Sequence, residues 1–309
     1  MRTANPLEIR QLGNTLMAVT AIGLGGAGLG GVFGSVGDTD AVAAVERALE
    51  LGINYVDTAP GYRDGERRTG LALRGVPRES YFLSSKIGSH PQIPGDYSAE
   101  AARWTVSNSL EVLGVDYLDL CHIHGPEPEQ LAAALAQGGA MEALVALKDE
   151  GVIRAIGIGV QDHELHRRAI ESGQLDVCMT VNDYTLLRQN VDDIFMLAQP
   201  RAIGMVNGAP LAMGLLSGRD PESIGTSLWS PPADEVHAAE KVHAWCSERG
   251  VSVLALALQF SLRRSEFDCT LVGAATAAEV EGCWEALNLE IPGHVWEALP
   301  TLLSEARVP

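Results

Sequence analysis

The most constraining feature of this sequence is an alternation of short apolar runs with amphipathic stretches, repeated about eight times. Such a pattern predicts parallel strands joined by crossover helices. The expected strands are residues 20–24, 53–57, 81–86, 117–124, 155–159, 177–181, 202–206 and 269–273. The preceding segment LEIRQLGNTLMAVT is expected to form an N-terminal hairpin.

The strand candidates are apolar on both faces, which is typical of strands buried inside and outside a barrel. The helices between them have readable ends, such as Ser98 as a candidate N-cap and Gly52 as a C-terminal stop. Eight units in 309 residues, with no linker, suit one (β/α)8 TIM barrel. We therefore predict an α/β fold of this type, with the hairpin, as a single domain over residues 1–309. A doubly wound open sheet is the alternative.

The charge composition bears on which binding partners the chain could have. The chain has 22 Lys and Arg against 40 Asp and Glu, a formal net charge of -18, which disfavours nucleic acid and anionic membrane surfaces. Its five cysteines are widely spaced without a C-x-x-C pair, and the N-terminus lacks an apolar signal region. These features predict a cytoplasmic protein with a small-molecule substrate, as a monomer or small homo-oligomer.

Ionisable side chains gather where three neighbouring strands are expected to end. Asp57 ends the second strand and Tyr62 follows it, Lys86 ends the third, and His122 and His124 end the fourth. In a (β/α)8 barrel these ends form the active-site face. Asp57 can compensate a buried Lys86, whose charge is then expected to lower the pKa of Tyr62. With His124 beside it, such a phenol suits proton transfer at a C–O group during hydride transfer.

At these residues the sequence resembles the aldo-keto reductases. INYVDTAPGYRDGE, FLSSKIG and YLDLCHIHGPE are similar to the family's segments for strands 2, 3 and 4. The resemblance implies a catalytic tetrad of Asp57, Tyr62, Lys86 and His124. The segments GLGGAGLGGVFGSVGDTDAV, NGAPLAMGLLSG, ALALQFSL and LVGAATAAEVEGCWEAL are most similar to the L-galactose and L-fucose (D-threo-aldose) dehydrogenase branch, which oxidises free sugars at C1, and pyridoxal 4-dehydrogenases are similar too.

The resemblance also implies a nicotinamide cofactor. The loop after strand 7 would run along its pyrophosphate through Pro210, Leu211, Gly214 and Leu216, and the segment containing Gly273, Ala274, Thr276 and Glu279 would meet its adenosine end. Asp57 is expected near the cofactor as well. A Rossmann reading of GLGGAGLGG would place the ribose-binding acid at Asp57, roughly 30 residues on where about 20 is usual.

Departures from the family pattern favour one cofactor over another. Glu279 stands where NADPH-preferring members place an arginine, and its charge would repel a 2′-phosphate, so NAD is favoured over NADP. The usual Ser-Asn pair is replaced by Gly159 and Val160, and the usual stacking aromatic by Gly208. The nicotinamide is then expected to be held through other polar residues, for which the candidates are Gln161, Asn182 and Asn207.

Several other readings stay open. His122 and His124 could share a metal, although none of the remaining histidines ends a predicted strand, so no metal is expected and His122 is read as a core residue. Phe33 and Trp229 are candidates for lining a sugar pocket, with ordinary surface packing as the alternative. The rival functions are an NAD(P)H-dependent carbonyl reductase, a pyridoxal 4-dehydrogenase-like enzyme, a non-catalytic cofactor-sensing subunit and a metal-dependent barrel hydrolase.

Overall fold

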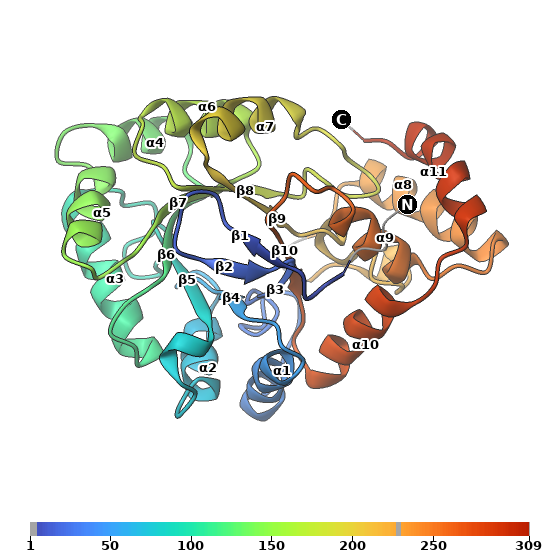
Figure 1. The fold of residues 1–309 in the computed structure, drawn as a ribbon, viewed down its shortest axis with the longest axis horizontal. Coiled ribbons are helices and arrows are strands. Elements are labelled where there is room, and N and C mark those ends of the chain that lie inside the picture. Colours follow the sequence, from blue (N-terminus) through green and yellow to red (C-terminus); the bar gives the residue numbers. More distant parts are fainter. Residues whose placement is uncertain (1–4, 227–229, 309) are drawn as a thin grey trace.

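The computed structural model describes residues 5–226 and 230–308, and a closed barrel of eight parallel strands lies at its centre (Figure 1). The strands follow one another around the barrel in chain order, and the last pairs with the first to close it. They are β3 (Ile22–Gly25), β4 (Tyr55–Asp57), β5 (Phe82–Ile87), β6 (Leu120–His124), β7 (Ile156–Val160), β8 (Val177–Val181), β9 (Gly204–Gly208) and β10 (Cys269–Gly273). Closure confirms the barrel prediction and rules out the open sheet.

Helices surround the barrel on its outer face, as Figure 1 shows. They are α1 (Asp38–Glu50), α2 (Gly65–Ala72), α3 (Ala99–Leu113), α4 (Pro128–Leu135), α5 (Ala140–Asp149), α6 (His163–Glu171), α7 (Asp192–Ala198), α8 (Ala233–Glu248), α9 (Val253–Leu262), α10 (Ala277–Asn288) and α11 (Gly293–Glu305). Their apolar faces and the outward residues of the strands form the larger of two buried clusters.

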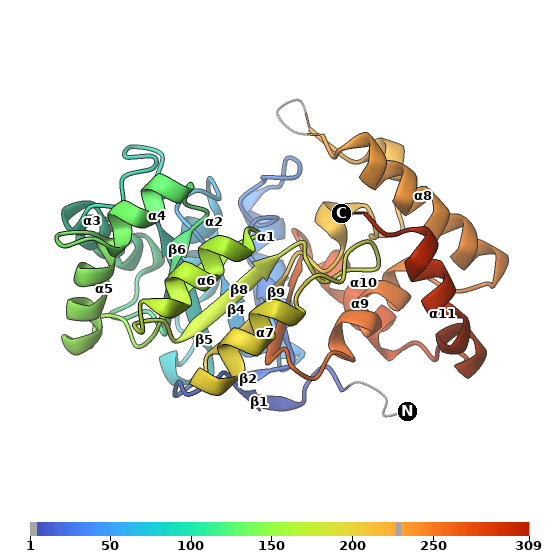
Figure 2. The same cartoon turned by 90° about the horizontal axis from the view of Figure 1, so that it is seen from above.

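The predicted N-terminal hairpin is present and lies across one end of the barrel (Figure 2). It consists of the antiparallel strands β1 (Ile9–Gln11) and β2 (Ala18–Thr20). Leu12, Met17 and Val19 from the hairpin form a second buried cluster with inward residues of the barrel strands. The hairpin therefore plugs this end with apolar side chains, and the ends of the strands that carry the polar residues lie opposite.

Local sequence signals explain some of the element boundaries. The Ser98 side chain accepts a hydrogen bond from the Ala101 amide at the start of α3, as predicted. The seventh barrel strand begins at Gly204, two residues later than expected. The reason is that residues 199–201 form a 3-10 turn and Ala202 adopts a left-handed backbone with φ +51°, which interrupts an extended chain.

Two further observations bear on the classes of site considered. Over residues 5–226 and 230–308, no helix has both the length and the apolar character needed to cross a bilayer. Within the same ranges, no group of three or more His, Cys, Asp and Glu side chains is arranged to hold a metal ion. All five cysteines are unpaired and buried.

Candidate active site

Three adjacent strands carry polar side chains to one rim of the barrel. Asp57 ends β4, Lys86 is the fifth residue of β5, and His124 ends β6. Parallel register aligns these ends, since Asp57 pairs with Ser84 and Lys86 pairs with His122. Side chains alternate between the two faces of a strand, so Ser84 and Lys86 share the inward face.

Asp57 and Lys86 form a buried ion pair. The Lys86 Nζ lies 2.5 Å from Asp57 Oδ2 and donates a second hydrogen bond to the Thr58 carbonyl at 2.8 Å. The Ser84 hydroxyl donates to the other carboxylate oxygen of Asp57 at 2.7 Å. Burial alone would lower the pKa of the Lys86 ammonium. The interactions with Asp57 and, next in size, with Tyr62 outweigh burial and raise this pKa above its usual value. Lys86 is therefore a fixed positive charge at neutral pH.

Tyr62 lies over this pair, at the turn between β4 and α2. The Lys86 Nζ is 4.9 Å from the centroid of the Tyr62 ring. Burial raises the pKa of Tyr62 above its ordinary value, and the charge and hydrogen bond of Lys86 offset this only in part. The expectation of a lowered pKa is therefore wrong, because it weighed the nearby charge and omitted the loss of water around the phenol. Tyr62 is a protonated phenol at neutral pH.

His124 completes the group from the third strand. Its ring lies edge-on to the Tyr62 ring, with centroids 5.4 Å apart. Nδ1 is 2.8 Å from the Ser89 hydroxyl, and the Tyr97 hydroxyl donates to the His124 carbonyl at 2.6 Å. Burial, together with the positive charge of Lys86, lowers the pKa of His124 to about 3. The imidazole is neutral and can hydrogen-bond an oxygen held beside Tyr62.

Sequence reasoning missed the residues that hold this group in place. Ser84 could have been found, because it lies two residues before Lys86 and so shares its face of the strand. Ser89 and Tyr97 lie in the segment between β5 and α3, and their contacts with His124 have no local sequence signal. His122, read as a core residue, is completely buried, and Gly157 on the next strand leaves the room that its ring needs.

A groove of about 630 Å³ opens beside the rim. One wall is the β3–α1 loop (residues 26–37), and the others are residues 209–226 after β9 and the start of α10. The loop also contacts the Tyr62 turn: the Gly26 amide donates to the Asp57 carbonyl at 2.7 Å, and a Cβ on Gly30 would lie 1.7 Å from the Tyr62 carbonyl oxygen. The groove and the polar group thus share this loop.

Most residues expected at a cofactor do line the groove. They are Pro210, Leu211, Gly214, Gly273, Ala274, Thr276 and Glu279, together with Phe33 from the substrate candidates. The four polar residues of the rim are not part of its lining. Trp229 lies outside the described residues.

Two expected cofactor residues point elsewhere. Leu216 is completely buried in the outer core, away from the groove. Asn207 is also completely buried, and its side-chain amide donates to the Tyr184 carbonyl at 3.0 Å and to the Ser261 hydroxyl. Val206 faces the barrel interior, so strand alternation turns Asn207 to the outer face. The placement of Asn207 corrects the expectation that its side chain contacts a cofactor. The expectation for Leu216 concerned its backbone and stays a prediction.

Asn182 occupies a different environment, directly after β8. It is buried, with a left-handed backbone at φ +60°. Its side-chain oxygen finds no hydrogen-bond partner among the described residues. A buried acceptor without a partner is costly, which makes Asn182 a candidate for holding a bound polar group.

Two features of the groove lining bear on the ligand that it could hold. Thr276 caps α10, accepting from the Glu279 amide at 3.2 Å, and the Glu279 carboxylate accepts from the Ala275 amide at 2.7 Å. Glu279 therefore caps the helix and lines the groove at once. Ala209, Ala212 and Met213 all have positive φ angles near +50°, a strained backbone for residues with a Cβ. Such strain clusters at ligand-binding segments.

Comparison with known proteins places this geometry in context. The model of the aldo/keto reductase family matches residues 21–303. The chain is 36% identical over 288 residues to L-galactose dehydrogenase from Arabidopsis thaliana, covering 89% of this chain and 86% of the relative. It is 31% identical over 319 residues to D-threo-aldose 1-dehydrogenase from a Pseudomonas species, covering 94% and 95%. The holo form of an aldo-keto reductase from Bacillus halodurans superposes with a TM-score of 0.77 at 25% identity, covering 96% of each chain.

Proposed function

Because this chain belongs to the aldo/keto reductase family, we propose that it is an NAD-dependent aldose 1-dehydrogenase that oxidises an L-galactose- or L-fucose-type sugar to its lactone. The observation that carries the proposal is the buried Asp57–Lys86 pair beneath Tyr62, with a neutral His124 beside the phenol. Two relatives matched along most of their length are named for aldose oxidation, which supports the substrate class.

In this proposal Tyr62 moves the proton. The C1 hydroxyl of the cyclic sugar hydrogen-bonds the phenol oxygen and His124, and Tyr62 accepts its proton once the phenol is deprotonated. Lys86 stabilises that phenolate, and Asp57 holds Lys86 in its charged form. For the reverse reaction, reduction of a carbonyl, the protonated phenol is ready to donate.

The residues of the groove fit a nicotinamide dinucleotide. Its volume and its strained backbone segment suit an elongated ligand. Pro210, Leu211 and Gly214 would lie along the phosphates, and Gly273, Ala274 and Thr276 near the adenosine end. Asn182 offers its unpaired oxygen to the carboxamide, and exposed Gln161 directly follows the neighbouring strand β7. When bound, the nicotinamide supplies the hydride acceptor or donor.

The choice of NAD over NADP rests on Glu279. Its carboxylate lines the groove and is fixed by the Ala275 amide, so a 2′-phosphate there would face a negative charge. Phe33 lines the groove from the β3–α1 loop and is proposed to pack against the C–H face of the sugar or against the cofactor.

Nicotinamide absorbance with a panel of substrates tests the proposal. Purified protein would be assayed with NAD or NADP and L-galactose, L-fucose, D-arabinose, D-galactose, pyridoxal and simple alcohols. We expect turnover of a subset of the sugars with NAD. Silence with every sugar, together with NADPH-driven reduction of aldehydes or ketones, would favour a carbonyl reductase, and turnover of pyridoxal alone would favour a pyridoxal 4-dehydrogenase-like enzyme.

A further inference from the structure

We propose that Arg68 is a positioning residue that holds the β3–α1 loop against the groove and thereby sets the affinity for the dinucleotide. The inference rests on the proposed function, because it takes the groove as the cofactor site. Arg68 lies in α2, shortly after the Tyr62 turn, and is not among the residues that line the groove. It acts only through the loop.

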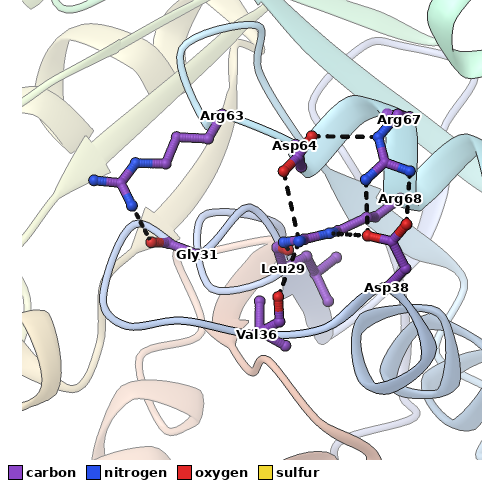
Figure 3. A network of polar contacts seen from close by, with 8 residues as sticks. All are labelled: Leu29, Gly31, Val36, Asp38, Arg63, Asp64, Arg67 and Arg68. Carbon is purple, nitrogen blue, oxygen red and sulfur yellow. Dashed lines mark hydrogen bonds and ion pairs between the residues drawn. The ribbon is translucent and has the colours of Figure 1, made fainter.

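Arg68 is buried, and its guanidinium forms hydrogen bonds with the loop at two positions, Leu29 and Val36. One amino group donates to the Leu29 carbonyl at 2.7 Å, and the other donates to the Val36 carbonyl at 2.9 Å. Nε donates to Asp38, the first residue of α1, at 2.9 Å. Figure 3 shows the side chain reaching across from α2 to these three partners, and to the Asp64 carboxylate at 3.5 Å. The fixed fork of a guanidinium is what allows one side chain to span two carbonyls and a carboxylate.

The loop that Arg68 holds is rich in glycine. Hydrogen bonds within residues 26–32 and the buried Leu29 order its first half, and Arg68 adds the hydrogen bond to Val36 that holds its second half. Six of its twelve residues are glycine, so ordering it costs more backbone entropy than ordering most loops. It carries Gly28, Phe33 and Gly34 into the groove wall. The same loop packs on the Tyr62 carbonyl through Gly30. A clamp on this loop therefore fixes one wall of the groove relative to the catalytic turn, before any ligand arrives.

A neighbouring arginine provides a matched control. Arg67 also pairs with Asp38, at 2.7 Å and 2.9 Å, and with Asp64, so it shares the charge environment of Arg68. It is largely exposed and donates to no carbonyl of the loop in the contacts of Figure 3. Arg63 is intermediate, because it makes a single hydrogen bond to the loop, to the Gly31 carbonyl at 2.7 Å.

The test measures the Kd for NADH by fluorescence in the full chain and in Arg68→Met, Arg68→Lys and Arg67→Met. We expect Arg68→Met to raise the Kd about tenfold or more, the size expected from losing a charged hydrogen bond that orders a binding wall. Arg68→Lys keeps the charge near Asp38 but lacks the fork, so its Kd should also rise. Arg67→Met should change the Kd less than about twofold.

Hydrogen exchange of residues 26–37 gives a second readout that does not need a ligand. Exchange should accelerate in Arg68→Met and Arg68→Lys and stay at the wild-type rate in Arg67→Met. In turnover assays, KM for NAD should rise more than kcat falls, because the proton-transfer group is untouched. If Arg68→Met fails to fold, Arg68→Lys decides the outcome.

The outcomes that contradict the proposed cofactor site differ from those that contradict the role of Arg68. A wild-type chain that binds no NADH would overturn the proposed cofactor site. A wild-type chain that binds NADH, with an unchanged Kd in both Arg68 variants or with equal losses in Arg67→Met, would overturn only the role of Arg68. Full recovery of the Kd in Arg68→Lys would also overturn it, because charge without the fork would then suffice.

Discussion

At the scale of single residues, the site depends on a charged pair that burial alone would disfavour. Asp57 and Lys86 are almost fully withdrawn from water. Transferring either charge alone into such surroundings costs several kcal/mol, so each depends on the other and on the hydrogen bonds from Ser84 and to Thr58. The pair holds a positive charge under the Tyr62 phenol, which a neutral side chain would not supply.

This dependence predicts strong coupling between the two residues. Lys86→Met should destabilise the fold by about 3–5 kcal/mol, because it leaves the Asp57 carboxylate buried without its partner. The double variant Asp57→Asn/Lys86→Met should lose clearly less than the sum of the two single changes. Urea unfolding of the four proteins measures the coupling, and strictly additive losses would contradict it.

The raised pKa of Tyr62 predicts how activity varies with pH. Sugar oxidation needs the phenolate, so kcat/KM for oxidation should climb with pH through the neutral and alkaline range without levelling below about pH 10. Carbonyl reduction uses the protonated phenol and should vary little over the same range.

Tyr62→Phe should lower turnover by at least about 100-fold and remove the pH dependence, with the Kd for NADH nearly kept. Tyr81→Phe, a buried tyrosine at the start of the β5 segment, is the control. Near-normal turnover in Tyr62→Phe would refute the assigned role.

At the scale of elements, one helix start combines a structural and a recognition role. Glu279 lies in the first turn of α10, where a carboxylate is favoured by the helix dipole and accepts from the Ala275 amide. The same carboxylate lines the groove. One side chain therefore contacts the helix start and lines the groove, so its effect on cofactor choice has to be separated from its effect on the helix.

Two substitutions separate these effects. Glu279→Arg should shift the NADP to NAD ratio of kcat/KM toward NADP by at least about tenfold, since a repulsive charge becomes an attractive one. Glu279→Gln keeps an oxygen for the Ala275 amide and removes only the charge, so it should give a smaller shift in the same direction. An unchanged ratio in both Glu279 variants would mean that another residue distinguishes NAD from NADP.

At the scale of the whole molecule, four of the eight histidines fall into two classes by environment. Burial lowers the pKa of His122, of His124 to about 3 and of His166 to about 4, so the folded chain keeps all three neutral. His163 lies at the surface of the β7–α6 turn, where hydrogen bonds with Asp183 and Asp193 raise its pKa to about 9 against the effect of burial.

These shifts predict a fall in stability on both sides of about pH 6.5. The unfolded chain protonates histidine near pH 6.5 and the folded chain does not protonate the three buried ones, so acid destabilises it by about 1.4 kcal/mol per pH unit for each. The His163 contribution is complete below pH 6.5 and is lost as pH rises to about 9.

Urea unfolding at several pH values measures the loss of stability below and above about pH 6.5. His163→Gln should reduce the loss of unfolding free energy above pH 6.5 and leave the loss below pH 6.5 unchanged. The exposed His237→Gln is the control and should alter neither. A stability that is independent of pH between 5 and 9 would contradict the assignment.

The sequence by itself determined the architecture and the position of the polar group. Period and turn residues located all eight barrel strands and the hairpin to within a few residues, because these signals act over a few neighbouring positions. Once a barrel is expected, the side chains at the ends of adjacent strands must meet, which brings Asp57, Lys86 and His124 together on one rim.

Only the tertiary structure decided how individual groups behave there. Whether the pKa of Tyr62 rises or falls depends on the balance between lost water and the charge of Lys86, which no spacing reveals. Asn207 faces outward because β9 extends to Gly208, two residues beyond its expected end, so that Asn207 lies within the strand and not in the loop after it. The hydrogen bonds from Arg68 to the Leu29 and Val36 carbonyls join residues more than 30 positions apart. Each of these depends on contacts between distant segments, and local sequence patterns carry no record of such contacts.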